Sequence, residues 1–178
     1  LSNARILNIP VHGTIDDLLS QAEQVVDANG FETARLRINL TRGPQRRFPI
    51  QHREGEETTF ITAINWEDPP HSEWLQGCHT VWAPFPLNHL SPLARVKSLC
   101  YTEYVVAREF ASQRGAHESI FYNIDDELAE GSMSNLFLVK DGALLTPAIE
   151  CGALPGIMRA NILEIARDLG LDVIQGSI

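Results

Sequence analysis

The stretch from residue 135 to residue 170 constrains the fold most, because it joins a hairpin signal to a helix signal. Two short apolar runs, "NLFLV" and "ALLTP", flank a Lys-Asp-Gly turn, which predicts a β-hairpin. The later segment "GIMRANILEIARDLG" repeats apolar residues at helical spacing and ends on Gly170, which predicts a helix. We expect its core face to carry Ile157, Ala160, Ile162, Leu163, Ala166 and Leu169. Strands and a helix in close succession predict a mixed α/β (α+β) fold.

The rest of the chain shows the same mixture of strand and helix patterns. Residues 13–30 predict a helix, because Thr14 can cap its start, Asp17 completes a capping box and Gly30 can end it. The other expected elements are strands at 33–41, 58–66, 79–83 and 118–124, and a helix with a broad buried apolar face at 101–115.

A candidate linker divides the chain. Residues 66–77, "WEDPPHSEWLQG", show neither the apolar spacing of a helix nor the alternation of a strand, and they contain adjacent prolines. We therefore expect two domains, one over residues 1–70 and one over residues 71–178.

Charge and composition exclude several classes of partner. The net charge is −9 and the 14 basic residues are scattered, which argues against nucleic acid or an anionic membrane and favours a small-molecule ligand. No uninterrupted apolar run reaches the roughly 18 residues of a membrane span, and the first ten residues lack the features of a secretion signal. The cytoplasm is the expected location.

Cysteine and histidine spacing gives no sign of a metal site or a disulfide framework. The three cysteines form no C-x-x-C pair, and the six histidines show no i, i+4 pairing. We expect reduced thiols and no bound metal.

The start of the last predicted helix is a candidate anion site. Gly152 and Gly156 allow close approach of the backbone, and Pro155 fixes the entry to the helix. Free N–H groups near Ile157 and Met158 would present partial positive charge to an anion. The plainer alternative, a loop-to-helix junction that binds only water or a cap, is the commoner one.

Two ionisable residues extend this hypothesis. Glu130 stands where a strand would end, and Lys97 lies between a proline-rich loop and an aromatic-bearing helix. Each taken alone is more often a solvated surface group. An amine, a carboxylate and an anion-binding helix start are together what is needed to hold pyridoxal phosphate: they supply a Schiff base, a partner for the ring nitrogen and a phosphate cradle.

Three segments carry a family resemblance: "LARVKSLCYTEYVVAREFASQRGAHESIFYN", "LAEGSMSNLFLVKDGALLTP" and "GALPGIMRANILEIARDLGLDV". They resemble the class IV (fold type IV) pyridoxal-phosphate enzymes, which include branched-chain aminotransferases, D-amino acid aminotransferases and 4-amino-4-deoxychorismate lyases. "RINLTRG" and "ILNIP" are also similar to the N-terminal half of that family. The resemblance implies a two-domain, aminotransferase-like architecture in which residues 71–178 belong to the cofactor-binding domain.

The resemblance also implies the central roles in the site. Lys97 would be the Schiff-base lysine and the base that moves the substrate proton, which makes it the catalytic residue. Glu130 would face the pyridine nitrogen and keep it protonated.

Four further residues would contact the cofactor by resemblance. Leu154 matches the aliphatic residue that props one face of the ring, and Ser134 lies in the loop near the other face. Ile157 and Met158 would donate backbone N–H groups to the phosphate.

Substrate binding and assembly are implied by resemblance as well. In the family a positively charged loop, partly supplied by a neighbouring subunit, meets the substrate carboxylate, and here Arg46 or Arg47 would serve. The alternative interpretation is a pair of solvated surface arginines. A homodimer is implied.

The chain departs from the family pattern at both ends. The arginine that grips the cofactor phosphate would lie before residue 1, and a Gly-Thr turn that completes the phosphate site would lie beyond Ile178. The N-terminal strands and the C-terminal closing segment would be missing too. We therefore expect a part of a longer protein, the alternative being a truncated product.

The expected function is a pyridoxal-phosphate-dependent aminotransferase that acts on an amino acid through Lys97. "KSLCYTEYV" lacks the Gly-Gly-Asn-Tyr run of branched-chain enzymes, and Cys100 replaces an asparagine often seen there. One alternative is an aminodeoxychorismate lyase, which releases pyruvate and 4-aminobenzoate. The other is a non-catalytic relative that keeps the fold and has lost the cofactor.

Overall fold

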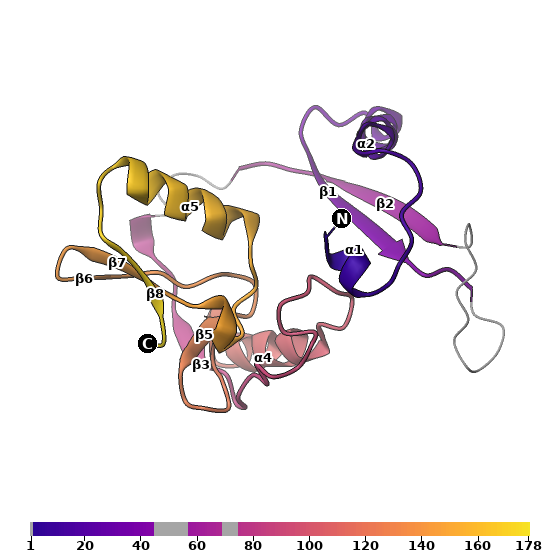
Figure 1. Cartoon of the computed structure of the whole chain (residues 1–178). Helices are drawn as coiled ribbons and strands as arrows, with labels where there is room; N and C mark the ends of the chain where they lie inside the picture. The colour runs from indigo at the N-terminus through magenta and orange to yellow at the C-terminus, as the bar shows by residue number, and fades with distance from the viewer. Residues whose placement is uncertain (1, 45–56, 69–74) are drawn as a thin grey trace. The chain divides into compact units, whose positions relative to one another are not determined.

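The computed structural model describes residues 2–44, 57–68 and 75–178 (Figure 1). Contacts within the chain divide it into two compact units, Leu1–Leu75 and Gln76–Ile178, and the division falls inside the segment 66–77. Both units mix helices with strands, which confirms the predicted α/β class.

The first unit begins with a short helix, α1 (Ser2–Ile6), which is followed by the longer helix α2 (Ile15–Asn29). Helix α2 has a defined cap at each end. The Asp17 N–H donates to Thr14 Oγ1 at 3.1 Å, and the Thr14 N–H donates back to Asp17 Oδ2 at 2.7 Å. Gly30 ends the helix with a φ of 64°, in the left-handed region that glycine adopts without strain. The predicted capping box and stop are both confirmed.

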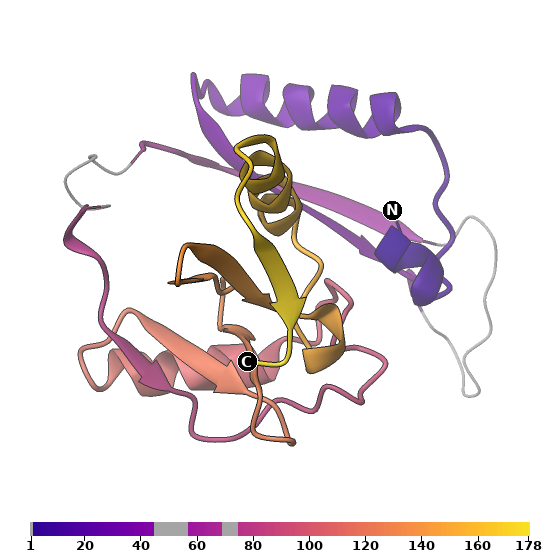
Figure 2. The same ribbon diagram turned by 60° about the vertical axis from the view of Figure 1, so that its left-hand side comes forward.

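Strands β1 (Ala34–Thr41) and β2 (Thr58–Asn65) pair antiparallel, in a register from Ala34 opposite Asn65 to Thr41 opposite Thr58. Helix α2 lies along this pair (Figure 2). Of the alternating apolar residues of β1, Leu36 and Ile38 stay 39% and 46% exposed. The sequence pattern therefore predicted the strand correctly, but its apolar side chains are only partly buried.

The second unit contains two three-stranded sheets, in the orders β3-β4-β5 and β6-β7-β8. In each sheet one pair of strands is parallel, β3 with β4 and β7 with β8, and a helix crosses over between the two. The elements and their bounds are β3 Thr80–Trp82, α4 Thr102–Ser112, β4 Glu118–Tyr122, β5 Leu128–Gly131, β6 Leu138–Lys140, β7 Ala143–Pro147, the 3-10 turn η1 Ile149–Cys151, α5 Ile157–Asp168 and β8 Val173–Gly176.

The predicted hairpin is present between β6 and β7, with Lys140 paired to Ala143. Asp141 and Gly142 form its turn, and both have positive φ, 52° and 81°. Positive φ at both central residues is the requirement of a tight two-residue hairpin loop, which explains the Asp-Gly pair. Strand β6 begins at Leu138, three residues later than predicted, so that Asn135 stays free of the sheet.

The predicted apolar faces of both crossover helices are wrong in part. Helix α4 buries Ala107 and Ala111, whereas Val105 and Val106 are 52% and 50% exposed. The cause is geometric: Tyr104 points into the core and aligns Ala107 and Ala111 with itself at i+3 and i+7. The two valines therefore lie on the opposite side of the helix.

Helix α5 shows a similar narrowing of its buried face. Leu163 and Ala166 are buried and Ile162 is half-buried, but Ile157 and Leu169, at its two ends, are 81% and 71% exposed, and Ala160 is exposed as well. Arg159 is buried instead, because its guanidinium donates to Pro147 O at 3.0 Å and to Gln175 Oε1 at 3.1 Å. Hydrogen bonds to β7 and β8 thus keep the charged Arg159 on the buried face of α5. The apolar spacing had predicted other residues for that face.

Candidate functional site

Glu130 is a buried carboxylate of the second unit. It lies on β5 and is only 5% exposed, and both of its oxygens accept hydrogen bonds. The Tyr104 hydroxyl donates to Oε1 at 2.7 Å, and the Leu154 backbone N–H donates to Oε2 at 2.8 Å. Two donors from distant parts of the chain therefore fix the orientation of this carboxylate.

The environment of Glu130 acts on its charge in two directions. Burial raises the pKa of Glu130 above its ordinary value, because the buried site solvates the charged form poorly. The Leu154 N–H, the Tyr104 hydroxyl and the positive charge of Lys97 each lower the pKa of Glu130 and oppose that rise. These groups compensate in part for the loss of water.

Lys97 lies in the loop before α4. The Ser98 N–H donates to Val96 O at 2.7 Å, so Lys97 is the central residue of a three-residue turn. Val96 is buried while the Lys97 side chain is exposed. The loop is therefore anchored by its apolar neighbour, and the amine is left accessible to a ligand within electrostatic range of Glu130.

The segment before α5 is held at Leu154 from two sides. Its N–H binds Glu130, and its carbonyl accepts a hydrogen bond from Asn135 Nδ2 at 2.9 Å. Gly156 lies against the same amide, because a Cβ added there would come within 2.5 Å of Asn135 Oδ1. The absence of a side chain at Gly156 thus allows this segment to approach the loop that contains Asn135.

Helix α5 begins directly after this clamp. Gly156 is its N-cap, no side chain caps it, and Ile157 and Met158 are the first two helical residues. The N–H groups of a helix's first turn have no acceptor within the helix, so they are available to an anion.

The loop after Glu130 is folded around a second carboxylate, that of Glu118. This carboxylate accepts from the N–H groups of Ser132 and Met133 at 3.0 and 3.2 Å and from the hydroxyl groups of Ser132 and Ser134. Gly131 allows the tight fold, since a Cβ there would lie 2.3 Å from Ser134 Oγ. The Ser134 hydroxyl proton is therefore donated to Glu118, and the hydroxyl oxygen has only lone pairs left for another partner.

The structure brings some of the predicted site residues into contact, places Lys97 within electrostatic range of them, and leaves Arg46 and Arg47 undescribed. Glu130, Leu154 and the first turn of α5 form one connected group, and Lys97 acts on it through its charge. Arg46 and Arg47 lie outside the described residues.

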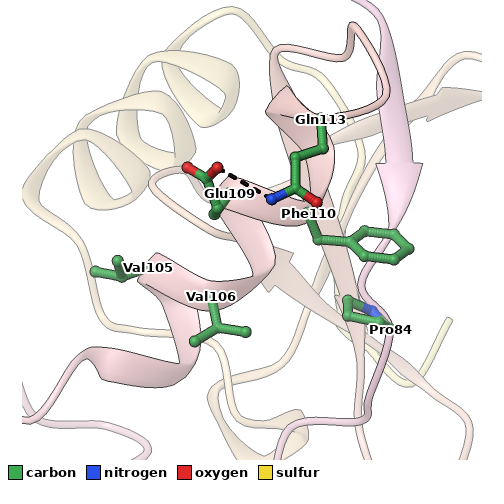
Figure 3. A pocket seen from close by; sticks show the side chains of 6 residues that line it. All are labelled: Pro84, Val105, Val106, Glu109, Phe110 and Gln113. Atoms are coloured by element: carbon green, nitrogen blue, oxygen red, sulfur yellow. Dashed lines mark hydrogen bonds between the residues drawn. The ribbon is translucent and has the colours of Figure 1, made fainter.

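A hollow of ≈ 390 Å³ lies elsewhere on the second unit, over the outer face of α4 (Figure 3). Its lining consists of Pro84, Val105, Val106, Glu109, Phe110 and Gln113, of which the last donates to Glu109 Oε1 at 3.1 Å. None of these residues belongs to the group around Glu130, and no titratable group other than Glu109 lines the hollow.

Residues 2–44, 57–68 and 75–178 contain neither a cluster of metal-ligating side chains nor a membrane-spanning helix. In these ranges no three His, Cys, Asp or Glu side chains are grouped to hold a metal ion. The helices of the same ranges are all too short or too polar to cross a membrane.

Comparison with known proteins decides the family. A sequence model described as "Amino-transferase class IV" matches residues 1–178. The chain belongs to the class IV aminotransferase family.

Individual relatives support the same assignment. The class IV chain is 30% identical over 176 residues to the branched-chain-amino-acid aminotransferase of Escherichia coli K12, and 28% identical over 174 residues to the D-alanine aminotransferase of Staphylococcus aureus N315. These alignments cover 96% of the chain, which spans 56% and 59% of the length of the two relatives.

A solved structure confirms the expected fold. The putative 4-amino-4-deoxychorismate lyase of Legionella pneumophila superposes on the class IV chain with a TM-score of 0.89 at 25% identity, covering 99% of this chain and 64% of that one. The resemblance to class IV enzymes stated from the sequence is therefore confirmed.

Three residues of this candidate site were not found from the sequence: Tyr104, Asn135 and Glu118. Each contacts a partner that is distant in the chain, such as Glu130, which is 26 residues from Tyr104. Tyr104 fell within an apolar helix pattern and Asn135 at the start of a predicted strand. The only local signal was a polar group in an otherwise apolar pattern, which does not identify its partner.

Proposed function

We propose that the protein containing this chain is a pyridoxal-phosphate-dependent aminotransferase that acts on an amino acid, with Lys97 as its catalytic residue. The observation that carries the proposal is the buried Glu130 carboxylate, held by Tyr104 and by the Leu154 N–H within range of the Lys97 charge. The chain spans little more than half of the first relative, so the activity is proposed for the whole protein.

The donors and acceptors of the site fit this cofactor. Glu130 offers a carboxylate to a protonated ring nitrogen, and the Ile157 and Met158 N–H groups at the uncapped start of α5 suit an anionic phosphate. Relatives with this fold are described in a PLP form and with pyridoxamine 5′-phosphate.

Two residues are assigned to the walls of the cofactor site. Leu154 is half-buried, and hydrogen bonds hold both its N–H and its carbonyl. Its backbone is therefore fixed, and its side chain is assigned to pack on one face of the cofactor ring. Ser134 belongs to the loop folded on Glu118 and is assigned to the other side. Its hydroxyl group acts there as an acceptor.

Bound pyridoxal phosphate supplies an aldehyde that captures amines and a ring that takes up the electron pair left when the substrate loses its α-proton. Lys97 Nζ would accept that proton from the substrate Cα and pass it to the cofactor, because returning it to Cα would only regenerate the amino acid. Glu130, in its ionised form, would accept a hydrogen bond from the ring N–H and so hold the ring. The Ile157 and Met158 N–H groups would hold the phosphate and so keep the cofactor in position.

Substrate recognition and assembly are assigned by resemblance. Arg46 or Arg47 pairs with the substrate carboxylate, in bidentate geometry that favours arginine over lysine. The protein acts as a homodimer in which the loop that carries these arginines is shared.

The test is addition of pyridoxal phosphate to the full protein that carries this chain. We expect a visible absorption band that is absent from Lys97→Ala, because the alanine cannot form the covalent bond to the cofactor. Lys140→Ala, which removes an exposed lysine of the β6–β7 hairpin, is the matched control and should keep the band. A colourless wild type would contradict the proposal and favour a non-catalytic relative.

A second candidate, aminodeoxychorismate lyase, is favoured by the Legionella pneumophila structure, whose description names that activity. Aminodeoxychorismate supplied without a keto-acid acceptor separates the two. Pyruvate release would support the lyase, whereas activity that requires an added keto acid would support the transaminase.

A further inference from the structure

Tyr104 is held rigidly beside Glu130 by core packing. Its ring meets Phe121 edge-on at a centroid distance of 5.2 Å, and it packs on the buried cluster that contains Ala107, Phe121 and Ala129. Because α4 fixes the backbone and Phe121 fixes the ring, the hydroxyl cannot turn away from Glu130 without disturbing the core. The 2.7 Å hydrogen bond is therefore a built feature of the fold.

The charges around this pair keep the Tyr104 hydroxyl protonated, so that it donates to Glu130. Burial, followed by the negative charge of Glu130 and its hydrogen bond, raises the pKa of Tyr104 far above its ordinary value, and Glu103 adds to the rise. Tyr104 thus keeps its proton wherever the protein is folded. The other groups that act on Glu130 are the positive charge of Lys97 and the uncharged Leu154 N–H.

We propose that Tyr104 is a positioning residue that keeps Glu130 ionised and turned toward the cofactor's ring nitrogen. The proposal rests on the proposed function and adds a residue to it. A buried carboxylate without donors would take up a proton and lose its ability to hold the ring N–H. Tyr104 and the Leu154 N–H occupy one lone pair on each oxygen and leave the remaining lone pairs for the ring.

The first test measures the ionisation of Glu130 in the full protein without cofactor. Carboxyl ¹³C NMR follows the titration, and Glu130→Gln identifies the signal by its loss. In Tyr104→Phe, which keeps the ring and its packing, we expect the Glu130 midpoint to move to higher pH, because a donor to the charged form is lost. Tyr122→Phe, at a half-buried tyrosine whose ring meets Trp82 edge-on, is the matched control and should leave the midpoint unchanged.

The second test follows cofactor binding against pH. In Tyr104→Phe the acid side of the pyridoxal phosphate binding curve should move to higher pH, with roughly two- to tenfold weaker binding on that side, the size expected for one lost hydrogen bond. Adding Tyr104→Phe to Glu130→Gln should not shift the pH dependence of pyridoxal phosphate binding any further, because no carboxylate is left to ionise. Tyr122→Phe should follow the wild type.

The outcomes separate this proposal from the proposed function. A Lys97-dependent band together with an unmoved Glu130 midpoint in Tyr104→Phe would overturn the role of Tyr104 and leave the enzyme assignment intact. A colourless protein whose Glu130 midpoint still rises in Tyr104→Phe would overturn the assignment of the cofactor and support the effect of Tyr104 on Glu130. A weakening of binding that is equal at every pH would also count against Tyr104, since it would indicate general damage.

Discussion

At the scale of the single residue, the buried negative charge of Glu130 lowers the free energy of unfolding. Burial raises its pKa, so the folded chain binds this proton more tightly than the unfolded chain does. Its contribution to the free energy of unfolding is therefore fully present below the unfolded pKa and is lost as pH rises through the folded pKa. Glu130→Gln lets the amide accept from Leu154 and donate to Tyr104, and should be more stable than the wild type near neutral pH.

Urea unfolding at a series of pH values measures this difference. The advantage of Glu130→Gln should shrink as pH falls through the raised pKa of Glu130, and it should be smallest below the ordinary glutamate pKa of 4.5, where the carboxyl is neutral in the folded and the unfolded chain. Glu164→Gln, which neutralises an exposed carboxylate on α5, is the control and should change little at any pH. An advantage that persists unchanged in acid would show that ionisation of Glu130 is not its cause.

At the scale of elements, the loop before β6 and the start of α5 are coupled through Gly156 and Asn135. The φ of Gly156 is −70°, which any residue adopts, so Gly156→Ala tests space rather than backbone strain. The added Cβ would meet Asn135 Oδ1 at 2.5 Å and push its amide away from Leu154 O. We expect a loss of about 1–3 kcal/mol in the free energy of unfolding, typical of an overpacked site.

A double-mutant cycle checks this coupling. In an Asn135→Ala background the obstructing amide is gone, so Gly156→Ala should cost much less, with a coupling energy of roughly 0.5–3 kcal/mol. Gly176→Ala on β8 meets nothing within 4 Å and should stay within about 0.5 kcal/mol of the wild type. Additive losses in the cycle would rule out the predicted contact.

Elements were predictable where their signals are local. The capping box of Thr14 and Asp17 and the Asp141–Gly142 turn involve neighbours in sequence, so the pattern alone predicted α2 and the β6–β7 hairpin. Strand β5, only four residues long, had no local signal apart from the position of Glu130. Buried faces of α4 and α5 were predicted less well, because a core tyrosine and a buried arginine changed which side each helix buries.

The same distinction applies to the candidate site. Residues that the motifs contain, such as Glu130 and Leu154, were predicted by resemblance and lie in contact. Tyr104 and Asn135 were missed, since their roles depend on partners 26 and 19 residues away. A single sequence does not show which distant polar groups will pair.

At the scale of the whole molecule, thiol reactivity reports whether the second unit is folded. All three cysteines are free thiols of that unit: Cys78 and Cys100 are exposed, whereas Cys151 is 4% exposed. Burial raises the pKa of the Cys151 thiol, and the hydrogen bond and charge of Glu127 raise it further, so little reactive thiolate forms there. An aromatic disulfide reagent added to the 178-residue chain should react quickly with two thiols and slowly with the third.

Denaturant identifies the origin of the slow phase. Cys151 lies at the end of η1, directly before the segment that reaches Leu154 and Glu130, so its exposure requires the second unit to open. The slow phase should be lost in Cys151→Ser, and its rate in the wild-type chain should rise with urea in parallel with unfolding. Three equally fast thiols in buffer would show that the second unit is open without denaturant, and the group around Glu130 would then require the rest of the protein, or the cofactor, to form.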